Sequence, residues 1–194
     1  MAAGVQAGFQ FRGCPKVTPQ ATWDDERYVG QWHEIIRDKL TWFEYGSGCV
    51  IAHYEIRGDK SIQVHNKNVY PLYGWYDLIG SAVESSDPGA SLRVSFDDDS
   101  MPKADERTNY NVMSTDYDTY SLVYSCEEFY DGFASLDTLW ILSRTPELPD
   151  EKMIEIISMI YEKLPEYDFW NNYHKTRQGE SCPYDTMPVT KKPE

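Results

Sequence analysis

Short strand-like segments recur at close intervals along most of the chain, and turn formers separate most of them. Each is rich in β-branched or aromatic residues, and no helical period interrupts the series. The eight segments are residues 28–37, 49–56, 61–68, 73–84, 91–96, 109–114, 119–126 and 138–144. This pattern predicts an all-β fold, either a closed antiparallel barrel or a sandwich.

A segment near the C-terminus has helical periodicity instead. Its apolar residues fall on one face of a 3.6-residue repeat; they are Met153, Ile154, Ile156, Ile157, Ile160, Tyr161 and Leu164. Pro149 suits the start of a helix and Pro165 its end. We expect one amphipathic helix over about residues 150–164, packed outside the barrel, and one more strand within residues 168–174.

The length of 194 residues fits one domain with tails. Residues 1–27 are polar and contain Pro15 and Pro19, so we expect an extended arm without helix or strand. The barrel with its helix is expected over residues 28–178, and a C-terminal tail over residues 179–194.

The net charge of −14 repels phosphate backbones, so nucleic acid is excluded as a partner. No apolar run approaches the roughly 20 residues that cross a bilayer, and no transmembrane segment is expected. The first ten residues lack the basic and long apolar segments of a signal peptide. The aromatic share of 14% suggests large pockets or broad β surfaces lined by rings.

Four widely spaced cysteines, Cys14, Cys49, Cys126 and Cys182, form no Cys-x-x-Cys pair. They are interpreted as two disulfides with three connectivities open, which implies an oxidising compartment. The alternative is four buried free thiols in a cytosolic protein. No two of the four histidines have metal-ligand spacing, so no metal site is expected.

Three motifs in order resemble the signatures of the lipocalin family. They are Gly30-Gln31-Trp32, the turn Thr115-Asp116-Tyr117, and the segment 140–146 with Arg144 at its strand end. The resemblance covers residues 14–185 and is nearest to apolipoprotein D, insect bilin-binding proteins and crustacyanin subunits; the tail 179–185 is similar to a crustacyanin tail. It implies an eight-stranded antiparallel up-and-down barrel.

The resemblance also implies roles for the motif residues. Trp32 and Arg144 would stack as a cation–π pair worth about 2 kcal/mol, closing the base of the barrel. Asp116 would accept backbone N–H bonds in its turn. The implied disulfides are Cys14–Cys126 and Cys49–Cys182.

Strand alternation assigns the residues expected to line the cup. Trp140 and Leu142 share a face with Arg144, and Tyr54 matches a pocket tyrosine of apolipoprotein D-like proteins. Val50 and Ala52 share the face of Tyr54. The expected rings around the mouth are Trp42, Phe43, Tyr45, Tyr73, Trp75 and Tyr76.

Together these features imply a secreted carrier of a small hydrophobic ligand: a carotenoid, bilin, retinoid, sterol or fatty acid. No cofactor is required, although a non-covalently bound carotenoid or bilin would make the protein a pigment. One alternative is a subunit that assembles with copies of itself or with other lipocalins through exposed rings such as Trp170 or Tyr184. A second is an enzyme acting on a lipid through Glu34, but a non-enzymatic role is expected.

Overall fold

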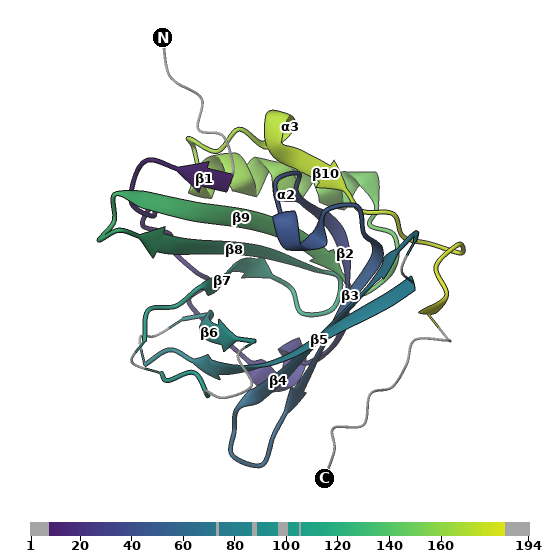
Figure 1. The fold of residues 1–194 in the computed structure, drawn as a ribbon, viewed down its shortest axis with the longest axis horizontal. Coiled ribbons are helices and arrows are strands. Elements are labelled where there is room, and N and C mark those ends of the chain that lie inside the picture. The colour runs from purple at the N-terminus through teal and green to yellow at the C-terminus, as the bar shows by residue number, and fades with distance from the viewer. Residues whose placement is uncertain (1–7, 73, 87–88, 97–100, 105, 185–194) are drawn as a thin grey trace.

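A closed ring of strands forms the body of the protein (Figure 1). The computed structural model describes residues 8–72, 74–86, 89–96, 101–104 and 106–184. The eight barrel strands are β2 (Gly30–Asp38), β3 (Gly48–Ile56), β4 (Ile62–Tyr70), β5 (Gly74–Glu84), β6 (Ser91–Ser95), β7 (Tyr110–Thr115), β8 (Tyr120–Phe129) and β9 (Ala134–Ser143). Each pairs antiparallel with the next, and β9 pairs with β2 to close the ring. The predicted antiparallel barrel is confirmed.

Two short strands extend the sheet at the junction of β2 and β9. β1 (Gly8–Gln10) pairs with β9 beyond the point where β2 begins to leave it, and β10 (Tyr173–Lys175) pairs with the end of β2. The described chain also contains one long helix, α2 (Asp150–Lys163), and three single turns: α1 (Asp25–Tyr28), the 3₁₀ turn η1 (Trp42–Glu44) and α3 (Phe169–Asn172).

The expectation that residues 1–27 contain no helix or strand is wrong for the described part. β1 forms there because free backbone groups of β9 are available to pair with it, and α1 begins where the Asp24 side chain accepts the N–H of Arg27. Likewise, the segment expected as a strand begins as α3. Asp168 caps it by accepting the N–H of Asn171, which favours a helical turn before β10.

The long helix α2 lies outside the barrel, as predicted. Ile156 and Ile160 are fully buried against the sheet. However, Ile154 is 64% exposed and Tyr161 40% exposed, so the buried stripe is narrower than expected. Both lie at the margin of the apolar face, where one helix packed on a curved sheet leaves side chains in water.

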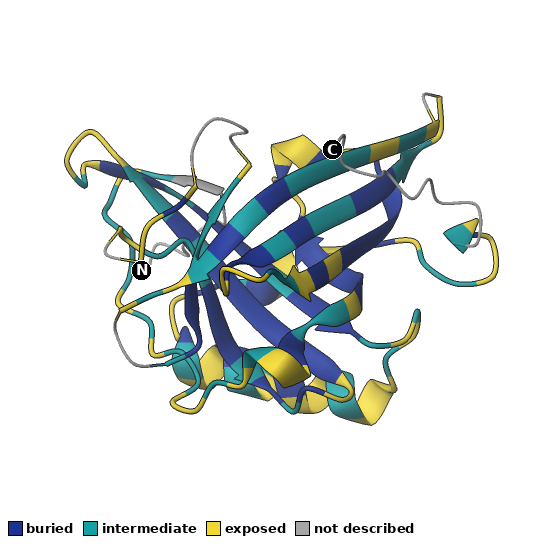
Figure 2. Ribbon diagram, turned by 90° about the horizontal axis from the view of Figure 1, so that it is seen from below, coloured by how far each residue is buried: buried dark blue, intermediate teal, exposed yellow. Residues whose placement is uncertain are grey.

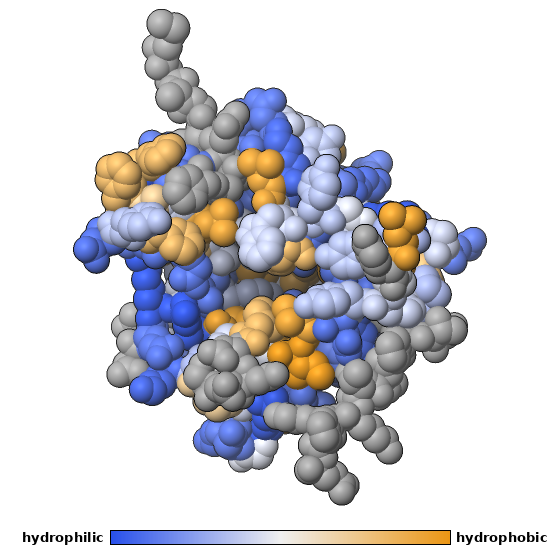
Figure 3. Space-filling view, in the orientation of Figure 1, coloured by the Kyte–Doolittle hydropathy of each residue, from blue (hydrophilic) through white to orange (hydrophobic). Residues whose placement is uncertain are grey.

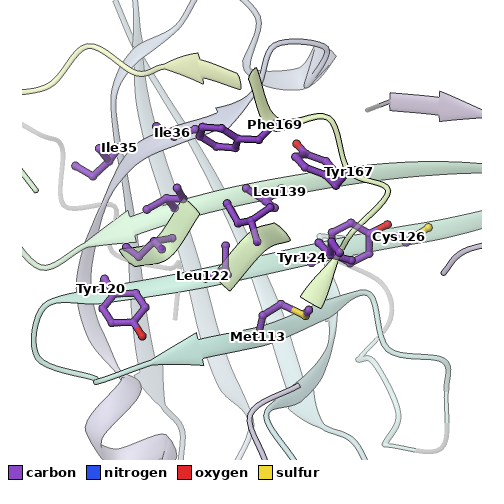
Figure 4. Packing of buried hydrophobic residues seen from close by; sticks show 14 residues of the cluster. Ile35, Ile36, Met113, Tyr120, Leu122, Tyr124, Cys126, Leu139, Tyr167 and Phe169 are labelled. Carbon is purple, nitrogen blue, oxygen red and sulfur yellow. The ribbon is translucent and has the colours of Figure 1, made fainter. Parts of the chain in front are cut away.

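Buried side chains form two clusters because alternate residues of each strand point to opposite faces. The outer cluster joins the barrel to α2 and includes Leu122, Leu139 and Phe169 (Figure 4). The inner cluster includes Trp32, Val112 and Val123. In Figure 2 the strands carry most buried positions, while helices outside the barrel show exposed ones.

The base of the barrel is closed by Arg144 and Trp32. The guanidinium carbon of Arg144 lies 3.7 Å from the centroid of the Trp32 ring. Arg144 also donates to four backbone carbonyls, those of Tyr117, Gln31, Arg27 and Tyr28. Gly30 has a φ of +95°, a conformation that glycine adopts without strain, and a Cβ there would lie 3.5 Å from Nη1 of Arg144. These contacts tie the start of β2 to the end of β9.

The turn between β7 and β8 is ordered by its own side chains. Oδ1 of Asp116 accepts the backbone N–H groups of Asp118, Thr119 and Tyr120 at 3.2, 2.8 and 3.1 Å. Thr115 Oγ1 accepts the N–H of Tyr117 at 2.9 Å. The carbonyl of Tyr117 then accepts from Nε of Arg144, which joins the turn to the base.

Two disulfides fix the ends of the chain to the barrel. They link Cys14 with Cys126 and Cys49 with Cys182, the pairs that the resemblance implied. In the chain-entropy model each stabilises the fold by about 4–5 kcal/mol, because the loops are longer than a hundred residues. In the described part of the chain, we find no helix with the length and apolarity needed to cross a bilayer.

A buried acid lies on the outer side of the barrel, at the end of β2. Asp38 Oδ2 accepts the N–H of Leu139 at 2.7 Å, and the hydroxyl of Tyr167 donates to Oδ1. Burial raises the pKa of Asp38 to about 7, against the lowering effect of these two hydrogen bonds. Between about pH 4 and pH 7, the folded protein therefore holds a proton on Asp38 that the unfolded chain has lost.

The base can be tested with Arg144→Lys. A lysine cannot replace the guanidinium that stacks on Trp32 and donates to four carbonyls, so the free energy of unfolding should fall by about 2–4 kcal/mol. Urea unfolding at pH 7 measures this. The control is Arg57→Lys, which removes one side-chain bond to Ser81 and should cost about 1 kcal/mol or less. Equal losses in both variants would mean that the base contacts do not stabilise the fold.

Asp38→Asn tests the raised pKa. Because the folded state binds the proton more tightly, Asp38 stabilises the fold most below its unfolded pKa of about 4. That stabilisation is lost as the pH rises through about 7. The difference in unfolding free energy, wild type minus variant, should thus decrease by about 3–4 kcal/mol from pH 4 to pH 7.5.

Chemical unfolding across this pH range measures the difference. The control Asp131→Asn, at an exposed position in the turn before β9, should change little with pH relative to wild type. A difference for Asp38→Asn that stays constant, or rises with pH, would contradict the raised pKa.

Candidate functional site

A cavity of about 220 Å³ lies inside the barrel, above the closed base. The space-filling view shows a hollow with hydrophobic side chains at its edge (Figure 3). Aliphatic side chains from the strands line much of the cavity: Val50, Ala52, Ile62, Val64, Ala82, Leu92, Val94 and Leu142. Such a wall favours apolar ligands, because a polar ligand would lose hydrogen bonds to water there and an apolar ligand would not.

Three tyrosines form a hydrogen-bonded cluster in the cavity wall. The hydroxyl of Tyr110 lies 2.9 Å from that of Tyr28 and 3.0 Å from that of Tyr54. Tyr28 also bonds Ser121 at 2.9 Å. Burial raises the pKa of Tyr28 to about 12 and raises the pKa values of Tyr54 and Tyr110 as well. The three hydroxyls are therefore neutral donors and acceptors.

A buried ionic cluster lies at the side of the cavity nearer the mouth. Nη1 of Arg37 donates to Glu34 at 2.6 Å and to Thr176 at 3.0 Å. Nη2 of Arg37 donates to the backbone carbonyl of Glu44 at 2.7 Å. Both Glu34 and Glu44 line the cavity. Burial, and then the negative charge of Glu34, raise the pKa of the Glu44 carboxyl well above its ordinary value, while Arg37 lowers it.

The five residues expected to line the cup all line the cavity: Val50, Ala52, Tyr54, Trp140 and Leu142. Of the rings expected around the mouth, Phe43 also lines the cavity, and Tyr73 lies outside the described residues. Trp42 and Trp75 are not among the lining residues. Trp42 is 73% exposed at the start of η1, with its ring edge against Phe43. Trp75 lies an odd number of residues before Ala82, which lines the cavity, so strand alternation directs it to the outer face.

The sequence does not identify Glu34, Arg37 and Glu44 as one cluster. Glu34 shares the inward face of β2 with Trp32, but a β-bulge between Glu34 and Ile36 then disrupts the alternation, and residues 32–38 are all buried. Arg37 is therefore interior, where strict alternation would not have assigned it. Glu44 lies in a loop, where no periodicity reveals which way a side chain points. Neither Tyr28 nor Tyr110 was singled out from the sequence as a cavity residue.

The described residues contain no group of three or more His, Cys, Asp or Glu side chains that could hold a metal ion. His53 is exposed on β3. His33 is buried and packs edge-on against Tyr184, with ring centroids 5.1 Å apart.

The open end of the barrel carries many exposed apolar side chains. It lies opposite the base, where the loops β2–β3, β4–β5, β6–β7 and β8–β9 come together. Exposed residues in the described parts of these loops are Leu40, Trp42, Phe43, Tyr45, Leu72, Phe96, Met101, Tyr130 and Phe133. Among the described residues, exposed apolar side chains therefore surround the mouth.

A closed barrel with a sealed base, an apolar cavity and a few inward polar groups defines a class of small-ligand-binding β-barrels. Residues 23–169 match the family model described as the lipocalin-like domain. The chain therefore belongs to the lipocalin family.

Related proteins agree with this assignment. Apolipoprotein D of Rattus norvegicus is 37% identical over 145 residues, which cover 74% of this chain and 72% of that protein. Among solved structures, insecticyanin of the tobacco hornworm Manduca sexta superposes with a TM-score of 0.72 at 22% identity, covering 91% and 92% of the two chains. H1 crustacyanin of the lobster Homarus americanus gives a TM-score of 0.72 at 20% identity, covering 94% and 97%. These two structures establish likeness of fold.

Tyr110→Phe tests the hydroxyl cluster. Removing the central hydroxyl leaves the buried hydroxyls of Tyr28 and Tyr54 each without one partner, so the free energy of unfolding should fall by about 1–3 kcal/mol. Thermal and urea unfolding measure the loss. The control Tyr70→Phe removes a hydroxyl that donates to an exposed loop carbonyl; its expected cost is about 0.5 kcal/mol. A Tyr110→Phe variant as stable as the control would show that the cluster is energetically unimportant.

Proposed function

We propose that the protein binds and carries a small hydrophobic molecule in the barrel cavity. The observation that supports this most directly is the combination of a sealed base with an aliphatic wall and a cluster of neutral tyrosine hydroxyls. The aliphatic wall would bury the apolar body of the ligand, and the hydroxyls would bind one or two polar atoms. We propose a binding role rather than a catalytic one, since Glu34, the acid considered for catalysis, is already bonded to Arg37 and Thr176.

The size of the cavity bears on which ligand fits. Its volume of about 220 Å³ is below the roughly 300–1,000 Å³ of pockets that enclose drug-sized molecules. The tyrosine cluster and Trp32 occupy the lower part of the barrel, which limits the depth. A retinoid or sterol would fill the cavity and protrude at the mouth, whereas a carotenoid or bilin would extend well beyond it. There its exposed part would lie against rings such as Phe43 and Trp42, and this is the form that a pigment role would take.

We further propose that the protein acts outside the cell. Both disulfides need an oxidising compartment to form and persist, which supports secretion.

The exposed rings at the mouth also suit contact with another lipocalin subunit. Trp170 on α3, which is not part of the mouth loops, is 61% exposed. Analytical ultracentrifugation at micromolar concentration would detect such an assembly.

Two tryptophan variants test the carrier role, with retinol as a fluorescent probe. Trp140→Ala removes a cavity-lining ring and should weaken retinol binding at least about tenfold, because the lost aromatic contact is worth more than about 1.4 kcal/mol. Trp42→Ala removes an exposed ring outside the cavity and should change the dissociation constant less than about threefold. Fluorescence titration measures both.

Equal effects of the two substitutions, or no retinol binding by the wild type, would count against this cavity as the retinol site. Mass and absorption spectra of protein purified from its source give an independent measurement. A co-purified apolar molecule would support the carrier role, and visible absorbance from that molecule would support the pigment form.

A further inference from the structure

The titratable groups that line the cavity are unbalanced in charge. Among the described residues, the lining includes the acids Glu34 and Glu44 but no lysine, arginine or histidine. Fatty acids and bilins carry carboxylates, whereas sterols, retinol and amines do not. The acidic groups in the cavity wall therefore discriminate between ligand classes that the aliphatic surface alone would accept equally.

The nearby cation, Arg37, has both Nη groups bonded to protein atoms, and its Nε lies 3.9 Å from Oε2 of Glu44. Nη1 is bonded to Glu34 and Thr176, and Nη2 to the backbone carbonyls of Glu44 and Ser47 at 2.7 and 3.4 Å. Arg37 is 2% exposed and does not line the cavity. A ligand carboxylate would thus meet two protein acids without an available counter-ion, and would lose its hydration as well.

The carboxyl of Glu44 is bonded to that of Glu34, and the donors that face it lie farther away than those of Glu34. Glu34 accepts a 2.6 Å bond from Arg37, and the hydroxyl of Thr176 also donates to it. For Oε2 of Glu44, by contrast, the indole N–H of Trp140 lies at 3.4 Å and Nε of Arg37 at 3.9 Å. Glu44 is only 7% exposed, so water compensates little. A buried acid that faces a cavity with long bonds is suited to accept a ligand's donor.

The fold does not need this carboxyl to hold the mouth loop. Arg37 bonds that loop through backbone carbonyls, and those bonds would persist without the Glu44 side chain. Burial and the charge of Glu34 raise the pKa of Glu44, because both disfavour a second negative charge beside the cavity. An ammonium group bound there would stabilise the ionised carboxylate.

We propose that Glu44, with Glu34 beside it, makes the cup selective for ligands whose polar end is a protonated amine, tolerant of neutral ligands, and unfavourable to carboxylates. This inference rests on the proposed carrier function and narrows its ligand class. It disfavours fatty acids and bilins, and it leaves retinol, sterols and carotenoids acceptable. Apolar amines are the preferred class.

The test uses three probes with the same apolar chain: octylamine, octanol and octanoate. Isothermal titration calorimetry at pH 7 with the wild-type protein should give the affinity order amine, alcohol, carboxylate. The amine should bind at least about tenfold more tightly than octanoate, as expected for one charge-assisted hydrogen bond. This comparison needs no variant, so it does not depend on how a substitution affects folding.

Glu44→Gln keeps the shape of the side chain and removes its charge. In this variant the amine and octanoate should differ by less than about threefold. The matched control is Glu55→Gln on β3, at an exposed position outside the cavity lining, which should keep the wild-type order. Melting temperatures of both variants report whether either is unfolded.

The outcomes separate the two proposals. Octanoate binding as tightly as octylamine to the wild type would overturn the charge selectivity and leave the carrier function intact. A Glu44→Gln variant that is folded and keeps the wild-type order would also overturn it, since the preference would then arise elsewhere. If none of the three probes binds, the selectivity and the carrier function fall together.

Discussion

The stacking of Arg144 on Trp32 determines which end of this barrel is open. The guanidinium joins the last barrel strand to the first by one ring contact and four carbonyl bonds. Without that junction, an eight-stranded barrel would have two open ends and no floor on which a ligand could rest. The Asp116 turn supports the same junction because Tyr117 supplies one of the carbonyls. This base is therefore the closed end of the cavity, and a ligand can enter only from the opposite end.

The polar groups of the cavity are arranged in two sets of different character. The tyrosine set is neutral, since burial raises the pKa values of its hydroxyls, and it supplies hydrogen bonds without charge. The acid set is ionic and is shared between β2 and the loop that follows it. Arg37 lies 2.6 Å from Glu34 but 3.9 Å from Glu44, so Glu44 is the acid of this set with the weaker ion pair, and it lines the cavity. The aliphatic surface of the cavity would determine how strongly a ligand binds, and the two polar sets would determine which class of ligand is preferred.

Strand positions were predictable because alternation and turn formers repeat in the sequence, and alternation placed Leu142 and Ala52 in the cavity. The same rule would have placed Trp75 outside, had it been applied from Ala82 along β5. The interior position of Arg37 depends on a bulge, which the sequence does not mark. Glu44 lies in a loop, and loop side chains are oriented by tertiary contacts. The disulfide pairs came from family resemblance, since spacing left three connectivities open.

The short strands β1 and β10 have a consequence for the behaviour of the protein at high concentration. Where β2 and β9 diverge, each would present unpaired backbone N–H and C=O groups, the kind of edge at which a second chain adds and aggregation begins. β1 covers residues 135–137 and β10 covers residues 36–38. The disulfides hold the segments next to these strands in place, as Cys14 follows β1 and Cys182 follows β10. Oxidation thus protects the barrel from intermolecular strand pairing as well as from unfolding.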